Sequence, residues 1–372
     1  MGLRIVVAMS GGVDSSLACA LLRERGHEVI GVTMRPWSED PSAWDPMLDR
    51  ARAAAEQLGV PHRVVDVSRQ FRRQVVDDFV ASYLEGRTPN PCVICNPAIK
   101  FDVLWEAVRD LDPDRMATGH YARRSRDPKG GRHLLLRGRD RGKDQSYVLW
   151  RVSQDQLSRS LFPLGELCKE QVRKMAADRG LEAKERAESQ EICFLFGEEY
   201  REFIARRAGC RIAPGPILDT RGRTLGQHRG LPFYTVGQRR GLGISAPHPL
   251  YVLELDRTRN AIIAGPRRSL EVDGAVLEDA NFIAISRLEG PMRVEVQVRY
   301  NARAASAQIR PGPGGGVLLR FDRPQRAVTP GQSAVCYRGD LLVGGGIIQR
   351  PQRIGSASPG HPMGGDRNGG EE

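Results

Sequence analysis

Short apolar runs alternate with amphipathic segments over the first 120 residues of the chain. Runs of strand length occur at residues 4–9, 28–34, 62–67 and 115–118. Apolar residues recur every three or four positions, the spacing of a helix face, at residues 13–25, 48–58, 70–84 and 98–111. This alternation predicts an α/β domain, in which a Rossmann-like parallel sheet carries helices on both faces.

The pattern changes after about residue 213, where Gly and Pro separate short segments. Strict alternation, typical of half-buried strands, then runs through Val294, Val296, Val298 and Tyr300. We predict a catalytic domain over residues 1–200, a small Arg-rich central domain over 201–272 and a C-terminal antiparallel β-barrel over 273–350. Residues 351–372 are rich in Gly, Pro and Ser and predict a disordered tail.

Composition excludes several classes of protein. Of the 372 residues, 40% are hydrophobic and 27% charged, and no apolar run approaches the ~18 residues of a membrane-spanning helix. The N-terminus has no secretion signal, and seven cysteines, an odd number, do not indicate a disulfide framework. A membrane protein is therefore excluded and a cytoplasmic location expected, where a specialised cysteine would be catalytic or metal-binding.

Positive charge is concentrated in one segment. Lys and Arg number 56 against 45 Asp and Glu, a net charge of +11. Residues 201–270 contain thirteen Arg and no Lys against four acids, a balance of +9. We expect a polyanionic partner such as RNA, although an Arg-rich solvated surface would have the same composition.

The first candidate site is SGGVDSS, residues 10–16, between the first predicted strand and helix. Gly11 and Gly12 allow a ligand to approach the backbone, while serine hydroxyls and the N–H groups of a helix N-terminus supply donors. An ordinary capped turn is the alternative. The string lacks the Lys of a G-x-x-x-x-G-K-[ST] loop, so it favours pyrophosphate binding and AMP transfer over γ-phosphoryl transfer.

The second candidate site is TPNPCVICNP, residues 88–97, in which three prolines predict an ordered extended loop. Asn96 would then cap a helix that begins at Pro97, and Cys95 would lie just outside the helix N-terminus. The helix dipole would lower the pKa of that thiol. The alternative is a buried apolar pair of Cys92 and Cys95.

Other strings carry weaker signals. The C-x-x-C of Cys92 and Cys95 has no second pair and no histidines at matching spacing, which disfavours a structural zinc site. Cys193, in ESQEICF, would alone indicate core packing. Thr118-Gly119-His120 ends a predicted parallel strand, at the edge where α/β sheets bind ligands. KDQS, residues 143–146, is equally compatible with a solvated turn.

Together these strings resemble the tRNA-specific 2-thiouridylases, which thiolate the wobble uridine of certain tRNAs. The resemblance extends to about Arg350 and rests on strings that occur in the family's order: AMSGGVDSS, GRTPNPCVICNPAIKFD, ATGHYAR, KDQSYVLW, SLFPLGELCKEQVRKMA, SQEICF, TVGQRRGLGI and TPGQSAVCYRGDLLVGGGII. It implies a pyrophosphate-loop ATPase domain, a small central domain and a C-terminal β-barrel.

The resemblance also assigns roles to residues at matching positions. ATP would be bound by Ala8, Met9, Ser10, Gly11, Gly12, Val13, Asp14, Ser15, Met34 and Gly119. Cys95 would be the catalytic nucleophile and Cys193 the persulfide carrier. The target base would lie near Asn90, Pro91 and Cys92. The tRNA would contact His120, Lys143, Asp144, Gln145, Arg299, Tyr300 and Gln332.

The implied reaction starts with adenylation of the uracil C2 oxygen by ATP, while the loop and Mg²⁺ neutralise the departing pyrophosphate. A sulfur-relay protein or a cysteine desulfurase would load a persulfide onto Cys193. Cys95 would attack this persulfide, which releases sulfide and leaves a Cys95–Cys193 disulfide, or would assist the transfer directly.

One position departs from the family pattern, because many members carry Asp where this chain has Cys92. Cys92, Cys95 and Cys193 could together hold a [4Fe–4S] cluster, with one iron free to bind sulfide. We keep this as an alternative mechanism.

Two other functions remain open. Another pyrophosphate-loop adenylating enzyme, such as an amidotransferase-type synthetase or a tRNA lysidine synthetase, would not need Cys95 and Cys193. An RNA-binding protein with a regulatory ATP site would explain the Arg-rich segment and the barrel without chemistry.

Overall fold

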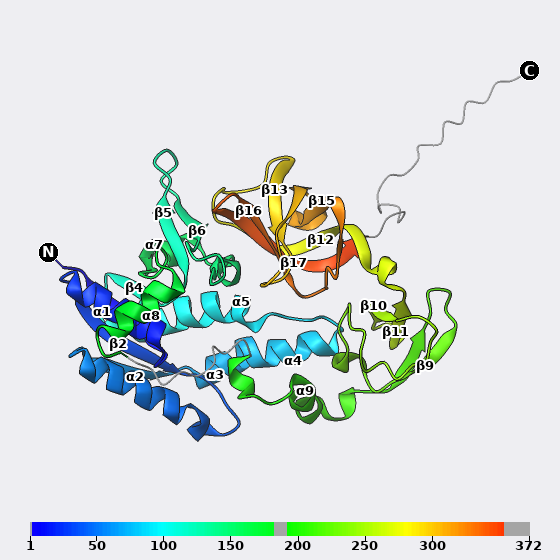
Figure 1. Ribbon diagram of the computed structural model, residues 1–372, viewed down its shortest axis with the longest axis horizontal. Coiled ribbons are helices and arrows are strands. Elements are labelled where there is room, and N and C mark those ends of the chain that lie inside the picture. The colour runs from blue at the N-terminus through cyan, green and yellow to red at the C-terminus, as the bar shows by residue number, and fades with distance from the viewer. Residues whose placement is uncertain (1, 182–191, 353–372) are drawn as a thin grey trace, which may run out of the picture.

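The computed structural model describes residues 2–181 and 192–352, and three sheets follow one another along this part of the chain (Figure 1). The predicted tail lies outside the described residues except for Pro351 and Gln352, which end the last strand. Within the described ranges, every helix is too short or too polar to cross a membrane.

The first sheet is parallel and has the strand order β3-β2-β1-β4-β7. Its strands are β1 (Arg4–Ala8), β2 (Glu28–Arg35), β3 (His62–Asp66), β4 (Arg115–Thr118) and β7 (Ser160–Leu161). The predictions for the first four match these bounds to within one residue. The strand order reverses on the two sides of β1, so the segments that follow β1 and β4 meet at the switch point where such sheets bind ligands.

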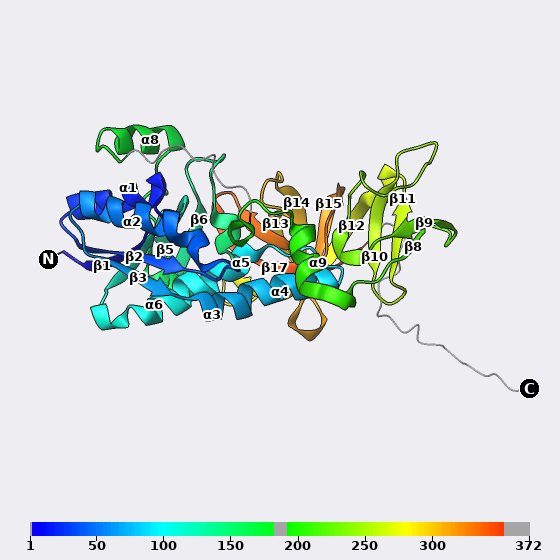
Figure 2. The same cartoon turned by 90° about the horizontal axis from the view of Figure 1, so that it is seen from below.

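Helices cover both faces of this sheet, because successive residues of β1 point to opposite sides. Ile5 and Val7 pack into one core and Val6 into the other. The first face is covered by α1 (Val13–Glu24), α2 (Asp45–Gln57) and α8 (Lys169–Ala177). The second face is covered by α3 (Ser68–Phe71), the π-helix η2 (Arg72–Val76), α4 (Asp77–Leu84), α5 (Pro91–Cys95), the π-helix η3 (Asn96–Val103) and α6 (Leu104–Ala107). Figure 2 shows the two layers on opposite sides of the sheet.

Short elements connect these layers to the rest of the chain. They are η1 (Pro41–Trp44), η4 (Arg109–Leu111), η5 (Ser146–Leu149), α7 (Gln154–Arg159), η6 (Cys193–Leu195), α9 (Tyr200–Ala208) and η7 (Gly209–Arg211). The buried aromatic side chains of η6 and α9, Phe194 and Phe203, pack against α3 and α4. η6 and α9 are therefore anchored on the second face of the parallel sheet.

The second sheet has the order β10-β11-β8-β9 and surrounds a small core of its own, which includes Ile217, Val252 and Ile262. Its elements are β8 (Gly215–Leu218), β9 (Thr224–His228), η8 (Leu231–Phe233), β10 (Tyr251–Asp256) and β11 (Ala261–Gly265). This small unit lies beside the end of α4 in both views (Figures 1 and 2).

The third sheet closes into an antiparallel barrel of six strands, because β12 pairs with both β15 and β17. The elements are η9 (Arg267–Leu270), β12 (Glu271–Phe282), β13 (Met292–Gln297), β14 (Ala305–Pro311), η10 (Pro313–Gly315), β15 (Val317–Arg326), β16 (Ser333–Arg338) and β17 (Leu341–Gln352). The predicted alternation extends beyond the strand, since β13 ends at Gln297 and both Val298 and Tyr300 follow it.

A hairpin that follows β4 in the chain joins the barrel to the parallel sheet. It consists of β5 (Ala122–Arg126) and β6 (His133–Arg137). β6 pairs with β17 through Leu136 and Leu341, which extends the barrel sheet to eight strands. The hairpin therefore ties the barrel to the segment that follows β4.

Candidate active site

The segment after β1 folds into a compact loop that leads into α1. Ser15 Oγ accepts a hydrogen bond from the N–H of Ser10 at 3.1 Å, and the hydroxyls of Ser15 and Ser16 each donate to the carbonyl of Gly12 at 3.1 Å. Gly12 is the N-cap residue and offers no side-chain acceptor. The hydroxyls therefore fix the loop, while the start of the helix keeps the donors and the positive dipole end that bind anions.

Two glycines allow the backbone of neighbouring segments to pack closely against this loop. Gly11 has φ +67°, and a Cβ there would lie 2.8 Å from the carbonyl oxygen of Met47 on α2. A Cβ on Gly119, which follows β4, would lie 2.9 Å from the backbone nitrogen of Ser15. Only glycine fits at either position. The ends of β1 and β4 thus meet at the switch point, and Gly119 is in contact with the loop.

The remaining residues predicted to bind ATP lie along the same edge. Ala8 ends β1 and Val13 begins α1. The N–H of Met9 donates to the carbonyl of Val32 on β2 at 2.8 Å. Met34 lies near the end of β2, half-buried, with its backbone in register with β3. The geometry is compatible with a nucleotide that extends from the loop across the end of β2.

Asp14 is held by two side chains from outside the loop. Lys169 Nζ donates to both carboxylate oxygens of Asp14 at 2.8 Å, and the hydroxyl of Tyr121 donates to Oδ1 at 2.8 Å. Lys169 is the first residue of α8, far from the loop in sequence. The loop has no lysine of its own, and Lys169 brings a cation to it from another helix.

The helix that carries the C-x-x-C begins at Pro91, so the predicted loop over 88–97 is wrong for its second half. Asn90 is the N-cap, and its side chain accepts the N–H of Cys92 at 3.1 Å. Asn90 and Pro91 thus have the roles that the sequence analysis gave to the Asn–Pro pair at 96–97. Cys95 is the last residue of α5 and lies inside a continuous helix, so the prediction of a dipole-lowered thiol pKa is also wrong.

Pro97 therefore lies within the helix, where it changes the local geometry. It has no N–H to donate, and its ring crowds the carbonyl one turn back, which favours a wider turn. The π-helix η3 begins at this point. The buried side chain of Asn96 ties this turn to η5, because its Nδ2 donates to the carbonyls of Cys92 at 2.9 Å and Val148 at 3.1 Å.

The π-helix brings Lys100 toward the thiols, because a π turn connects residue i to residue i+5 and Lys100 follows Cys95 by five. Lys100 Nζ lies 3.5 Å from His120 Nε2, and His120 Nδ1 lies 2.7 Å from Thr118 Oγ1. Burial of His120 and the charge of Lys100 hold the pKa of the imidazole well below its usual value. The neutral ring can accept from the Lys100 ammonium and donate to Thr118.

Three thiols gather around Lys100. Enclosure by protein raises the pKa of Cys95 to about 11 and that of Cys193 to about 12, and it also raises the pKa of Cys92. Cys92 and Cys193 nevertheless keep exposed surface on one side. The charge of Lys100 lowers each of the three pKa values, whereas the other two thiols raise that of Cys193. The structure thus brings the predicted nucleophile and persulfide carrier together, and both are protonated at neutral pH.

The three thiols do not form a ready metal site. In the part of the chain that the structure describes, no three histidine, cysteine or acidic side chains form a group that could hold a metal ion. A [4Fe–4S] cluster with one open iron requires three protein ligands. Such a cluster places each cysteine on a different iron rather than all three around one ion, so a cluster on Cys92, Cys95 and Cys193 stays an alternative mechanism.

The barrel contacts residues 88–97, the cysteine segment, through the loop between β15 and β16. Gln332 Nε2 donates to the carbonyls of Thr88 at 2.8 Å and Pro89 at 3.4 Å. Gly331, with φ +89°, leaves no room for a Cβ, which would lie 2.8 Å from the nitrogen of Thr88. Gln332, which was predicted to contact tRNA, thus holds the segment that leads to Asn90.

Three further residues predicted to contact tRNA have their side chains engaged within the protein. Asp144 pairs with Arg137 at 3.0 Å, and its side chain is only 6% exposed. Gln145 Oε1 accepts the N–H of Tyr121 at 3.0 Å, and His120 is buried. These side chains shape the segment between β4 and η5, and their contact with RNA stays a prediction.

Arg299, Tyr300 and Lys143 lie nearer the surface. Arg299 Nη2 donates to Thr329 Oγ1 at 2.9 Å, beside the loop that contacts the cysteine segment. Tyr300 is 37% exposed, and its ring meets that of Tyr147 edge to face, with ring centroids 5.9 Å apart. Lys143 is half-buried in the turn before η5. These residues are placed around the site, and their roles toward tRNA stay predictions.

Comparison with known proteins covers nearly all of the chain. The model of the tRNA methyl transferase HUP domain matches residues 3–197, that of the tRNA methyl transferase PRC-barrel domain residues 201–266, and that of the aminomethyltransferase β-barrel domain residues 272–348. The tRNA-specific 2-thiouridylase MnmA of Moorella thermoacetica is 52% identical over 357 residues, which cover 94% of this chain and all of the relative. The chain belongs to the tRNA-specific 2-thiouridylase family.

Other members of this family are almost as similar. MnmA of Pelotomaculum thermopropionicum is 46% identical and aligns over 93% of this chain and 97% of its own length. Among solved structures, the U34-tRNA thiolase NcsA from Methanococcus maripaludis with its [4Fe-4S] cluster aligns with a TM-score of 0.33 at 16% identity, over 56% of this chain and 67% of that one. Nothing about this 2-thiouridylase follows from so distant a likeness.

Three residues of the site were not predicted from the sequence: Lys100, Tyr121 and Lys169. Lys100 follows Cys95 by five residues, a spacing that puts two side chains on one side of a helix only across a π turn. Pro97 inside the helix is the sequence signal from which this π turn could have been predicted. Tyr121 and Lys169 reach Asp14 across more than 100 residues, and no local pattern marks such a contact.

The raised pKa of Cys95 predicts a steep pH dependence of its reactivity. Because only the thiolate is nucleophilic and the pKa is about 11, alkylation should accelerate about tenfold per pH unit between roughly pH 7 and pH 9. Lys100→Met should slow it by about three- to tenfold, since the cation lowers this pKa. The alkylation rate is measured by mass spectrometry of the peptide that contains Cys95. A Cys92→Ala background leaves Cys95 as the one thiol between residues 88 and 97. Lys174→Met, an exposed lysine on α8, is the control. A pH-independent rate would contradict the protonated state.

Proposed function

We propose that the protein uses ATP to replace the C2 oxygen of the wobble uridine in tRNA with sulfur, and that Cys95 and Cys193 perform the transfer. The observation that carries this proposal is a set of contacts that leads from the nucleotide loop to Lys100, whose charge acts on the thiols. Gly119 touches Ser15, His120 follows Gly119 and contacts Lys100, and Lys100 acts on the thiols. An adenylated base at the switch point would therefore meet the sulfur carrier.

The loop would support the first half-reaction. The uracil C2 oxygen attacks the α-phosphorus of ATP, which forms an O-adenylated uridine and expels pyrophosphate. The N-terminus of α1 and Lys169 stabilise the charge that develops on the phosphates. When bound with ATP, Mg²⁺ would neutralise further charge on the pyrophosphate.

The thiols would perform the second half-reaction by one of two routes. In the first, the Cys95 thiolate attacks Sγ of the Cys193 persulfide, which breaks the S–S bond and releases sulfide. The sulfide then attacks C2 and expels AMP. In the second, the outer persulfide sulfur attacks C2 and AMP leaves, after which Cys95 cleaves the S–S bond. Both routes leave 2-thiouridine and a Cys95–Cys193 disulfide, which a two-electron reductant must reopen.

The persulfide must come from another protein. Cys193 keeps exposed surface, so a sulfur-relay protein or a cysteine desulfurase could reach it. All seven cysteines are free thiols in the structure, in keeping with a reducing compartment, and we propose that the protein acts in the cytoplasm.

The experiment that tests the mechanism compares the native chain with Cys92→Ala. Each protein is purified anaerobically and supplied with ATP, a persulfide donor and unmodified tRNA, and 2-thiouridine is quantified by mass spectrometry of nucleosides. We expect Cys92→Ala to retain activity within about threefold, because the two-cysteine route does not use that thiol. Cys210→Ala, at an exposed cysteine outside the site, is the matched control.

Iron and acid-labile sulfide are measured on the same samples. Iron in the native protein, together with loss of both iron and thiolation in Cys92→Ala but not in Cys210→Ala, would overturn the two-cysteine route in favour of the cluster. Formation of AMP with no 2-thiouridine in the native protein would favour another adenylating enzyme. Binding of tRNA without formation of AMP would favour an RNA-binding protein.

A further inference from the structure

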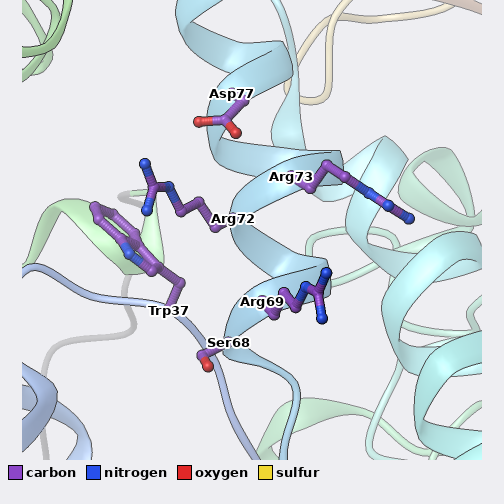
Figure 3. A pocket seen from close by; sticks show the side chains of 6 residues that line it. All are labelled: Trp37, Ser68, Arg69, Arg72, Arg73 and Asp77. Carbon is purple, nitrogen blue, oxygen red and sulfur yellow. The ribbon is translucent and has the colours of Figure 1, made fainter.

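A basic hollow with a volume of about 400 Å³ lies at the carboxyl edge of the parallel sheet, next to β2 and β3. Figure 3 shows the side chains that line it: Trp37, Ser68, Arg69, Arg72, Arg73 and Asp77. Trp37 follows the end of β2, and the other five lie on one continuous helix formed by α3, η2 and the start of α4. None of these residues belongs to the site described above.

The three arginines carry positive charge that the protein does not neutralise. Arg69, Arg72 and Arg73 are exposed, and within the described residues their guanidinium groups make no ion pair or hydrogen bond. The acid of the hollow is already engaged, because Asp77 pairs with Arg207 at 3.3 Å. In Figure 3 the Arg72 side chain lies toward Trp37, whereas Arg69 and Arg73 extend to the other side of the helix.

The tryptophan is held in place by α9. The guanidinium of Arg207 lies 4.8 Å from the centre of the Trp37 ring, and the ring of Phe203 meets Trp37 edge to face at 6.3 Å. The indole is therefore a half-buried wall, held by two neighbours, beside exposed cationic side chains. Such a combination of aromatic surface and arginine is typical of RNA-binding surfaces.

The hollow is close to the thiols through direct packing. Phe71 and Phe79, from the helix that carries the arginines, meet Phe194 edge to face, with ring centroids 5.9 Å and 5.3 Å apart. Phe194 follows Cys193 directly. The helix that carries the arginines therefore packs directly on the residue that follows the persulfide carrier.

We propose that Arg69, Arg72 and Arg73 bind phosphates of the tRNA backbone, Arg69 and Arg73 on one side of the helix and Arg72 on the Trp37 side, beside the nucleotide that enters the active site. The proposal rests on the proposed function, which makes tRNA the substrate. Guanidinium groups match phosphate oxygens with two parallel hydrogen bonds. Arg69 and Arg73, four residues apart, extend to the same side of the helix, whereas Arg72 lies toward Trp37. Side chains four residues apart on a helix have Cβ atoms about 5–6 Å apart, a spacing similar to that of neighbouring phosphates on one strand.

The test measures tRNA affinity against salt for the full chain. In Arg69→Gln/Arg72→Gln/Arg73→Gln, we expect the Kd for unmodified tRNA to rise about ten- to a hundredfold at roughly 0.1 M KCl. The slope of log Kd against log[KCl] should fall by about two to three, because each lost phosphate contact removes roughly one. The affinity for ATP, measured without tRNA, should match that of the native protein and shows that the variant is folded.

A charge-matched control separates specific contacts from the loss of net charge. Arg23→Gln/Arg25→Gln/Arg115→Gln removes the same charge at the amino edge of the sheet, where Arg23 and Arg25 end α1 and Arg115 begins β4. An equal loss of affinity in both triple variants would overturn the proposal. Unchanged tRNA affinity with slower loading of persulfide from a donor protein would also overturn it and assign the hollow to an acidic protein. Absence of thiolation by the native chain would instead refute the proposed function.

Discussion

Cys95→Ser should abolish the formation of 2-thiouridine while leaving the first half-reaction intact. We expect at least about a thousandfold loss of thiolation under turnover conditions, because a serine hydroxyl cannot replace the thiolate that attacks the persulfide sulfur. Release of pyrophosphate in the first turnover, which depends on the loop and on tRNA, should remain within about threefold of the native rate. Rapid-quench measurement of pyrophosphate and of 2-thiouridine in the same reaction separates the two steps.

The control for this prediction is Cys210→Ser, which changes an exposed thiol outside the site. It should behave as the native protein in both measurements. Thiolation by Cys95→Ser above about a tenth of the native rate would show that another group is the nucleophile. Loss of pyrophosphate release as well would show that Cys95 supports the fold or the binding of tRNA rather than sulfur transfer alone.

Gly119→Ala should nearly eliminate the use of ATP. The new Cβ would lie 2.9 Å from the nitrogen of Ser15 and 3.1 Å from the carbonyl carbon of Asp14, both of them backbone atoms of the loop. The loop would have to shift away from the new Cβ, and a misplacement of about 1 Å costs about a hundredfold in rate at a site that depends on positioning. Formation of AMP in the presence of tRNA should therefore fall about a hundredfold.

Gly290→Ala is the matched control, because a Cβ there meets only open space and the backbone is not in the left-handed region. It should retain native activity. Thermal unfolding of both variants shows whether the effect is local. Formation of AMP by Gly119→Ala within about threefold of the native rate would mean that the nucleotide does not depend on this close approach.

The parallel sheet could be predicted because its signals are local. Alternation of Ile5, Val6 and Val7 between two cores follows directly from the strand period, and Gly26 ends the helix where the apolar spacing stops. The limits of such reasoning appear at β13, where the alternation continues past the strand into a turn. Pairing with β14 and β16, which decides where the strand stops, is not encoded within the segment itself.

The cysteine segment could be identified but not correctly folded from the sequence. Two Asn–Pro pairs, at 90–91 and 96–97, carry the same helix-start signal, and local rules do not choose between them. The structure uses the first, since Gln332 of the barrel fixes the segment before Asn90. Pro97 then becomes a source of π geometry. The pKa of Cys95 is therefore raised rather than lowered, because burial outweighs the helix dipole.

The measurement that tests the central claim most directly is the state of the thiols after one turnover. Protein carrying a ³⁵S-labelled persulfide on Cys193 is mixed with ATP and excess unmodified tRNA in the absence of reductant, and both products are analysed. The account predicts one labelled 2-thiouridine for each Cys95–Cys193 disulfide formed, and neither product without ATP. Labelled 2-thiouridine formed while Cys95 and Cys193 both remain free thiols would contradict it.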